Sequence, residues 1–457
     1  MLLTDTPSLV SDSFSAPGLS DHHVVVVKHQ LKATINKKTA REAPLYHKAN
    51  WEDMNEDLKL FAKGYLESSP RERSIRTNWS SIKAAIHKAI IDRIPHKKVS
   101  SRFNLPYMTP DIKRKINRRK RVHKRAVKFK RPADREMSKR LRKEINRDLD
   151  ESYNKYIQGM LNTEQDKPGA MKRLYRFIKS LGRDSFGVST LRTGGRVHAT
   201  AKEKAEACNK QFHSVFSQEG DELPPTPPGP RLPDMPAIRV THKGVLDLLE
   251  AIVPGKASGP DNIPARVLKE SAESLAPVLT DFFQQSLDES RVPDDWKQQH
   301  VHPIFKKGSK SDPANYRPVA LTCLLSKMLE HIIASSIHSH LDSYSFLAAV
   351  QHGFRKYRSC ETQLTTVITD LVNWMNKKKI VDAIVLDFSK AFDKVPHDML
   401  LAKLAHAGVT GTTRRWIRHW LKGREHRDVI DGEMSEPYEV TSGVPQRRTS
   451  FILDIHQ

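Results

Sequence analysis

The chain has 457 residues, and its 77 Lys and Arg against 53 Asp and Glu leave a formal net charge of +24 at pH 7. Apolar residues make up 38% of the sequence and no apolar run approaches about 18 residues, which indicates a globular chain of about three domains and excludes a membrane-spanning helix. The three cysteines, Cys208, Cys323 and Cys360, are odd in number and far apart, which excludes a disulfide framework or a zinc site. A positive surplus of this size favours a polyanionic partner, most often nucleic acid, over a merely soluble basic protein.

Residues 1–35 end in the run HHVVVVKHQL, whose β-branched residues predict a strand. The opening MLLTDTPSLV has neither a basic segment nor a long apolar core, so we expect no signal peptide. The cysteine pattern fits a reducing compartment, and we therefore expect a nuclear or cytoplasmic protein rather than a secreted or membrane protein.

Residues 36–218 are predicted to be mainly helical and are strongly basic. Between residues 113 and 147 there are 18 Lys or Arg and three acidic residues, a net charge of +15. Thr109 as N-cap, Pro110 at the first helical position and Asp111 in the first turn predict the start of a helix. Further on, apolar residues recur every four positions and predict one apolar stripe: Met137, Leu141, Ile145, Leu149 and Tyr153.

The basic face of this region has two interpretations. It is either a solvated charged surface or a surface that binds the backbone of a nucleic acid. Like charges at this density repel one another, so we favour backbone binding, which gives affinity without sequence choice. The residues expected to contact phosphates are Lys113, Arg114, Lys115, Arg118, Arg119, Lys120, Arg121, Lys124 and Arg125.

Residues 219–236, EGDELPPTPPGPRLPDMP, contain seven prolines, which predict an extended linker and a domain boundary. Residues 237–457 alternate apolar helical patterns with short β-prone runs and predict an α/β domain. Within it, the turn that begins at Gly255 predicts a helix from about Pro264.

Two further stretches of this region carry basic residues beside turns. In HPIFKKGSKSDPANYRPVALT, from His302, a short strand is expected to lead to Lys306, and a long helix is expected to open at Tyr316. In QHGFRKYRSCETQL, Arg355 precedes another predicted helix. Arginine suits bidentate phosphate contacts, although each stretch alone fits a surface loop equally well.

The stretch KIVDAIVLDFSKAFDKVPH contains a candidate metal ligand, Asp387. Its apolar run Ala383–Leu386 predicts a buried strand that ends at Asp387. A carboxylate at a strand end is a common metal ligand and also a common turn residue, and Asp387 alone leaves both open. Helices that stop at Gly408 and Gly423 and a hairpin around Asp431-Gly432 are predicted to follow.

Five of these sequence motifs occur in an order and spacing that resemble those of a known protein family. A Gly-Pro-Asp turn, NYRPVALT, QHGFRKYRSCETQL, VLDFSKAFDKVPH and SGVPQ follow one another between about residues 240 and 446. In this order and spacing they resemble the reverse transcriptase of non-LTR (LINE-type) retrotransposons, jockey-like or related. The resemblance implies an α/β (α+β) right-hand polymerase. It assigns the fingers to about 255–375, followed by a partial palm that begins with the strand of Asp387.

The resemblance also implies roles for individual residues. Asp387 matches the aspartate that binds catalytic Mg²⁺, or Mn²⁺ in its place, in two-metal nucleotidyl transfer, and carboxylates suit these hard ions. Phe392 matches the bulky side chain under the sugar, where it would clash with a 2′-hydroxyl. Asp393 is expected to be a structural partner of the following helix. The other residues expected to contact the nucleotide are Phe388, Arg355, Gln446, Arg317 and Lys306. The implied partners are an RNA template, a DNA primer or target, and deoxynucleoside triphosphates, while the oligomeric state stays open.

The N-terminal LSDHHVVVV resembles the final Ser-Asp-His motif of the apurinic-type endonuclease that precedes the polymerase in such elements. Asp21 and His22 would then belong to a remnant of that nuclease in residues 1–35. Its other motifs are absent from this sequence, so we expect no intact nuclease.

The sequence departs from the family after Gln446. It reads RRTSFILDIHQ where the family has Gly-Ser-Val-Leu-Gly-Pro, and it contains no Ala-Asp-Asp hairpin. One carboxylate cannot hold two metal ions, so we expect the chain as written not to polymerise. Two alternatives stay open: a non-catalytic nucleic-acid-binding protein, and a relic with an incomplete core.

Overall fold

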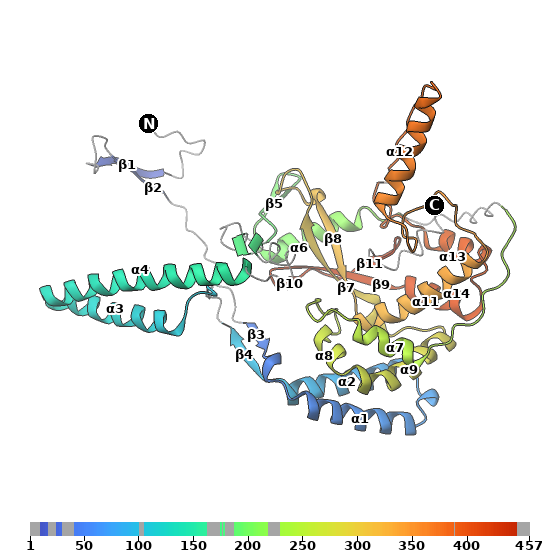
Figure 1. Cartoon of the computed structure of the whole chain (residues 1–457), viewed down its shortest axis with the longest axis horizontal. Helices are drawn as coiled ribbons and strands as arrows, with labels where there is room; N and C mark the ends of the chain where they lie inside the picture. Colours follow the sequence, from blue (N-terminus) through green and yellow to red (C-terminus); the bar gives the residue numbers. More distant parts are fainter. Residues whose placement is uncertain are drawn as a thin grey trace. The chain divides into compact units, whose positions relative to one another are not determined.

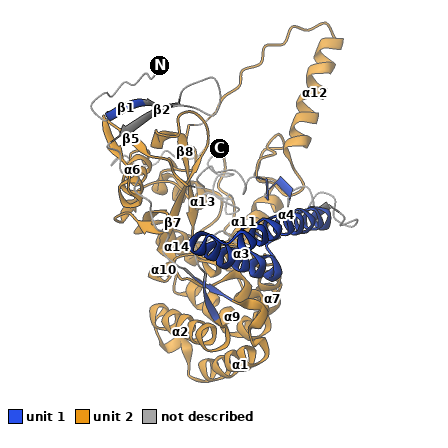
Figure 2. Ribbon diagram, turned by 90° about the vertical axis from the view of Figure 1, so that its left-hand side faces the viewer, with its two compact units in different colours: residues 1–44, 96–179 blue, residues 45–95, 180–457 orange. Residues whose placement is uncertain are grey.

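The computed structural model describes residues 10–16, 24–29, 41–99, 105–161, 174–175, 177–178, 187–217, 229–387 and 389–445. The chain forms two compact units, residues 1–44 with 96–179 and residues 45–95 with 180–457, which Figure 2 shows in two colours. No helix among the described residues combines the length and the apolar character needed to cross a bilayer.

The first unit contains two short hairpins and one long helical hairpin. Its elements are β1 (Val10–Ala16), β2 (Val24–His29), β3 (Arg41–Pro44), β4 (His96–Val99), α3 (Pro110–Phe129) and α4 (Pro132–Leu161). The strands pair antiparallel, β1 with β2 and β3 with β4. The predicted strand in HHVVVVKHQL is confirmed as β2.

The helical hairpin α3–α4 begins as the sequence predicts. The Thr109 side chain accepts a hydrogen bond from the Ile112 backbone N–H, and Pro110 is the first helical residue. Lys130, in the left-handed conformation at φ 50°, ends α3, and Pro132 opens α4. Figure 1 shows the two helices side by side.

The stripe expected on α4 is only partly right. Leu141 and Ile145 are buried, whereas Met137 and Tyr153 are 41% and 36% exposed. A spacing of four residues exceeds the helical repeat of 3.6, so such a row drifts around the helix by about 40° per step. The buried seam passes through Ser138 instead of Met137.

The second unit is a mixed helix and sheet structure. Its helices are α1 (Trp51–Glu67), α2 (Ile75–Arg93), α6 (Ala201–His213), α7 (His242–Glu250), α8 (Ala265–Glu270), α9 (Ala272–Asp288), α10 (Asp294–Lys297), α11 (Leu324–Ser343), α12 (Cys360–Asn376), α13 (His397–His406) and α14 (Gly411–Leu421), with 3₁₀ turns η2 (Tyr46–Lys48), η3 (Pro70–Glu72) and η4 (Pro313–Asn315). Its strands are β5 (Leu191–Thr193), β6 (Arg196–His198), β7 (Gln298–Phe305), β8 (Tyr316–Leu321), β9 (Arg424–Ile430), β10 (Glu433–Met434) and β11 (Tyr438–Val440).

The central sheet of this unit has the order β10-β9-β7-β8, with β11 also paired to β9. Strand β7 runs antiparallel to β8 and parallel to β9. Helix α6 packs on one face of the sheet, and Phe212 forms a small core there with Val301, Tyr316 and Ile430. We call this face, covered by α6, the inner face of the sheet.

Two predictions about this sheet need correction. The helix expected to open at Tyr316 starts only at Leu324, because Tyr316–Leu321 pairs with β7 as strand β8. The strand expected at Ala383–Leu386 does not form, and Ile384, Val385 and Leu386 are 86%, 90% and 85% exposed. A β-prone run becomes a strand only where a second backbone takes its hydrogen bonds, and no described strand pairs with this run.

The large core of the second unit joins distant parts of the sequence. Helices α1 and α2 share one hydrophobic cluster with α7, α9, α11 and α14, and Figure 1 shows α1 and α2 beside α9. The compact units therefore do not follow the expected boundary of one basic helical region at 36–218. The amphipathic helices α1 and α2 bury Met54, Leu58 and Ile82 completely or nearly so, and that burial includes them in this unit.

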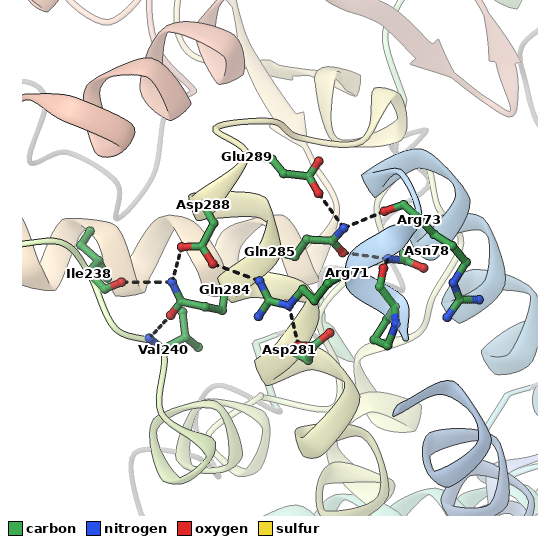
Figure 3. A network of polar contacts seen from close by, with 11 residues as sticks. Arg71, Arg73, Asn78, Ile238, Val240, Asp281, Gln284, Gln285, Asp288 and Glu289 are labelled. Carbon is green, nitrogen blue, oxygen red and sulfur yellow. Dashed lines mark hydrogen bonds and ion pairs between the residues drawn. The ribbon is translucent and has the colours of Figure 1, made fainter. Parts of the chain in front are cut away.

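A polar network, shown in Figure 3, reinforces this packing between α2 and α9. The Asn78 amide donates to the carbonyl of Pro70 and to Gln285 Oε1, each at 2.7 Å. Gln285 in turn donates to the Arg73 carbonyl at 2.8 Å and to Glu289 at 2.6 Å. Arg71 pairs with Asp281 and Asp288 at the exposed edge.

We expect Asn78→Ala to lower the free energy of unfolding by about 2–3 kcal/mol, because it leaves the buried Oε1 of Gln285 without a donor and removes a hydrogen bond to the Pro70 carbonyl. The matched variant is Arg71→Ala, which removes the exposed ion pairs and should cost about 1 kcal/mol or less. Denaturant unfolding of both variants measures the difference. Equal losses would show that the exposed ion pairs matter as much as the buried amides.

Candidate functional site

Two segments that lie some fifty residues apart in sequence meet in the second unit. The Val444 N–H donates to the Phe392 carbonyl, and the Gly443 N–H donates to the Val395 carbonyl, each at 2.8 Å. The Ser442 hydroxyl donates to the Asp393 carbonyl at 2.7 Å. These bonds fix the chain around Phe392 against the Ser-Gly-Val turn.

Gly443 is required at this junction. Its φ of +84° is unfavourable for any other residue, and a Cβ there would lie 2.5 Å from the Phe392 carbonyl oxygen. The close approach of the two backbones therefore depends on the missing side chain. The ring of His397 contacts the Gly443 carbonyl at 2.8 Å from the other side.

The Phe392 side chain brings a third sequence motif to the junction. Its ring meets the ring of Phe354 edge to face, with centroids 6.1 Å apart and planes at 89°. Arg355, the next residue, donates to the Ala348 carbonyl at 3.0 Å and lies 3.5 Å from Asp342. Arg355 is thus already engaged by its own loop.

Lys306 and Arg317 lie on the two arms of the β7–β8 hairpin. Ile304 is directly opposite Arg317, and the Lys306 N–H continues the pairing with the Asn315 carbonyl. Side chains alternate along a strand, so Lys306 shares the face of Ile304 and Arg317. Both basic side chains are exposed, and they form one positive edge.

Asp387 and Asp393 have different surroundings. Asp387 is exposed at the end of the unpaired run Ala383–Leu386. Asp393 is half-buried at the junction, and burial raises the pKa of its carboxyl group, with Lys390 opposing. The backbone carbonyl of Asp393 accepts a hydrogen bond from the Ser442 hydroxyl. The N-cap residue of the following helix, α13, is Pro396 and not Asp393. Among the described residues, no group of three His, Cys, Asp or Glu side chains could hold a metal ion.

A cavity of about 50 Å³ opens beside the junction. Phe392, Gly443 and Pro445 form part of its wall, and the inner face of the sheet forms another part through Gln299, Arg424 and His426. The sequence interpretation missed these three polar residues. The signal was present in strand β9, where Arg424, His426 and Asp428 occupy alternate positions that should be apolar on a buried face.

The first unit carries the basic surface expected from the sequence. Helix α3 contains ten Lys or Arg residues and one acid, whereas α4 contains seven and six. Of the predicted phosphate contacts, Arg114, Lys115 and Arg125 pair with Asp111, Asp148 and Asp134. No ion pair involving another described residue engages the exposed Arg118, Lys120, Arg121 and Lys124. Lys113 and the half-exposed Arg119 lie on the same helix.

Four of the residues predicted from the sequence lie outside the described part of the chain. They are Asp21, His22, Phe388 and Gln446. Pro445, the last described residue, lines the cavity.

Comparison with known proteins gives matches over the same part of the chain. Residues 304–446 match the family model for reverse transcriptase (RNA-dependent DNA polymerase). The probable RNA-directed DNA polymerase from transposon BS of Drosophila melanogaster is 25% identical over 378 residues, which cover 79% of this chain and 41% of that protein.

Two similar relatives are RNA-directed DNA polymerases from the mobile element jockey. The protein of Drosophila funebris is 28% identical over 54% of this chain and 26% of its own length. The protein of Drosophila melanogaster is 28% identical over 46% of this chain and 23% of its own length. The chain thus spans less than half the length of these relatives.

Proposed function

Residues 304–446 are a reverse transcriptase domain of the LINE type, and on that premise we propose that this chain forms the fingers and part of the palm of an RNA-directed DNA polymerase of a mobile element. Its substrates would be an RNA template, a DNA primer or target, and deoxynucleoside triphosphates. The junction between the Phe392 segment and the Ser442–Val444 turn is the observation that carries the proposal, because it unites two motifs that contact the nucleotide in the family.

In this proposal the chain's own residues bind and orient the nucleotide. Phe392 lies under the sugar, held by the Gly443 turn and by Phe354. Lys306 and Arg317 contact the triphosphate from the hairpin, because cationic donors form strong hydrogen bonds with phosphate oxygens. Arg355 is better suited to holding its loop, since Asp342 and a carbonyl already engage it.

The described residues do not fit a two-metal site. The family relies on divalent ions, and Asp387 is the one carboxylate at a matching position. It is exposed, and no described group of acids or histidines accompanies it. One exposed carboxylate cannot hold two metal ions, so we expect no primer extension from this chain with Mg²⁺. Template-dependent synthesis that Asp387→Ala abolishes would contradict this expectation.

The double variant Lys306→Ala/Arg317→Ala tests the binding role. We expect it to weaken the affinity for a deoxynucleoside triphosphate about tenfold or more, because two charge-assisted hydrogen bonds are lost. The control is Lys307→Ala/Lys310→Ala at the tip of the same hairpin, which removes equal charge. Fluorescence titration of a labelled nucleotide measures both, and equal losses would favour a merely electrostatic surface.

A second candidate function rests on helix α3. Its unpaired basic side chains suit the backbone of a nucleic acid, so the chain can act as a non-catalytic nucleic-acid-binding protein. The two functions are compatible, because α3 and the junction belong to different units.

A further inference from the structure

The inner face of strand β9 is unusual for a buried surface. Arg424, His426 and Asp428 are 1%, 1% and 0% exposed, and they alternate with outward-facing residues. Among the described residues, six polar atoms of these side chains find no hydrogen-bond partner: Nε and Nη2 of Arg424, both ring nitrogens of His426, and both carboxyl oxygens of Asp428. Native proteins rarely leave buried polar atoms unpaired, so the nitrogen atoms of Arg424 and His426 indicate a missing partner, whereas Asp428 does not line the cavity.

Of the three residues, Arg424 has the highest free-energy cost of burial, because its side chain is charged. Its Nη1 donates to the Trp420 carbonyl at 3.3 Å, and its guanidinium lies 5.0 Å from the centre of the Trp420 ring. No carboxylate of a described residue forms an ion pair with it, although Glu330 is close enough to act on its charge. Glu330 itself accepts from Ser326 and Trp420. A buried guanidinium stays charged, so its two unpaired donors require an acceptor.

The Arg424 side chain lines the cavity beside the junction, together with His426 and Gln299. Burial lowers the pKa of His426 to about 4, so at neutral pH its ring is uncharged and can donate one hydrogen bond. The side-chain oxygen of Gln299 has no partner in the described ranges, and a flip of the side chain would present its NH₂ group there. The walls are largely apolar and include Phe212, Phe216 and Val301. A few polar groups in an apolar hollow are typical of a ligand site.

We propose that this cavity binds a small oxyanion of the size of phosphate, with Arg424 as the charged anchor and His426 and Gln299 as neutral donors. The space of about 50 Å³ holds a few water-sized groups, which suits one tetrahedral anion. Water alone would not neutralise the buried charge. Two ionisable side chains lie at the rim of the cavity. Burial raises the pKa of the Asp393 carboxyl group, and Lys390 adds a positive charge beside it.

The cavity shares Phe392 with the proposed nucleotide site, but its anion-binding side chains are different ones. Lys306 and Arg317, which are proposed to contact the triphosphate, do not line the cavity. The anion site therefore does not rest on the polymerase proposal, and its experiment uses neither template nor nucleotide.

The test is thermal unfolding of the full chain with inorganic phosphate, at constant ionic strength made up with chloride. We expect about 10 mM phosphate to raise the Tm of the unmodified chain by about 3 °C, because a ligand that binds only the folded state stabilises it. Arg424→Met should lose this response and, without phosphate, should melt at or above the temperature of the unmodified chain, since it removes an unpaired buried charge.

The control is Arg427→Met, which removes the same charge from the opposite face of the same strand and should keep the full response. If Arg424→Met does not fold, His426→Leu takes its place and should respond to phosphate by about half as much. An unmodified chain that ignores phosphate overturns the proposal. So does an Arg424→Met chain, or a His426→Leu chain in its place, that responds fully.

Discussion

Changing Arg118, Lys120, Arg121 and Lys124 together to glutamine is expected to weaken binding of single-stranded RNA about a hundredfold at about 0.1 M salt. These side chains are exposed on α3 and have no ion pair with a described residue. Each phosphate contact releases counterions, so affinity falls with salt in proportion to the number of contacts. Loss of four contacts should reduce the slope of log affinity against log salt by about 3.

The control for this prediction is a matched loss of charge on α4. Glutamine at Lys139, Arg140, Arg142 and Lys143 removes four exposed positive charges from the same hairpin. On α4 the basic residues are interspersed with six acids, so its local field is weak and we expect affinity within about threefold of the unmodified chain. Filter binding over a salt series measures both variants. Equal losses would mean that net charge, and not the face of α3, determines binding.

The second large effect is expected at Gly443. Gly443→Ala should lower the free energy of unfolding by about 3–5 kcal/mol and weaken nucleotide binding along with it. The left-handed backbone accounts for about 1–2 kcal/mol, and the rest arises because the new Cβ would press on the Phe392 carbonyl 2.5 Å away.

Gly432→Ala separates these two contributions. Gly432 has a similar φ of +92°, but no atom of the described part of the chain lies within 4 Å of its Cβ position. We therefore expect it to cost only the backbone term, about 1–2 kcal/mol. Urea unfolding of the two variants gives the difference. If they lose the same stability, the close approach at the junction contributes nothing, and the two motifs do not hold each other.

Much of the local structure could be predicted from the sequence because its signals act over a few residues. Thr109 and Pro110 start α3, Gly408 and Gly423 follow the ends of α13 and α14, and Asp431-Gly432 forms the turn between β9 and β10. The meeting of the Phe392 segment with the Ser-Gly-Val turn was not predicted. The resemblance assigned Phe392 and Gln446 to the nucleotide, and spacing alone indicates no contact between the two segments.

The failures concern long-range partners. Whether the run Ala383–Leu386 forms a strand depends on a second strand, which local β-propensity does not specify. The location of α1 and α2 depends on α9, and Asn78 and Gln285 are 207 residues apart. The buried charges of β9 contradict the usual alternation of a strand, and such contradictions occur where a protein has a further requirement to meet.

That separation between α2 and α9 has a consequence for synthesis of the protein. Translation proceeds at about 5–20 residues per second, so the ribosome completes α2 roughly 10–40 s before Gln285 emerges. During this interval Met54, Leu58 and Ile82 lack the part of their apolar cover that α9 supplies. Newly made α1 and α2 are therefore expected to be a binding site for chaperones that recognise apolar segments on nascent chains, and release should coincide with the emergence of α9.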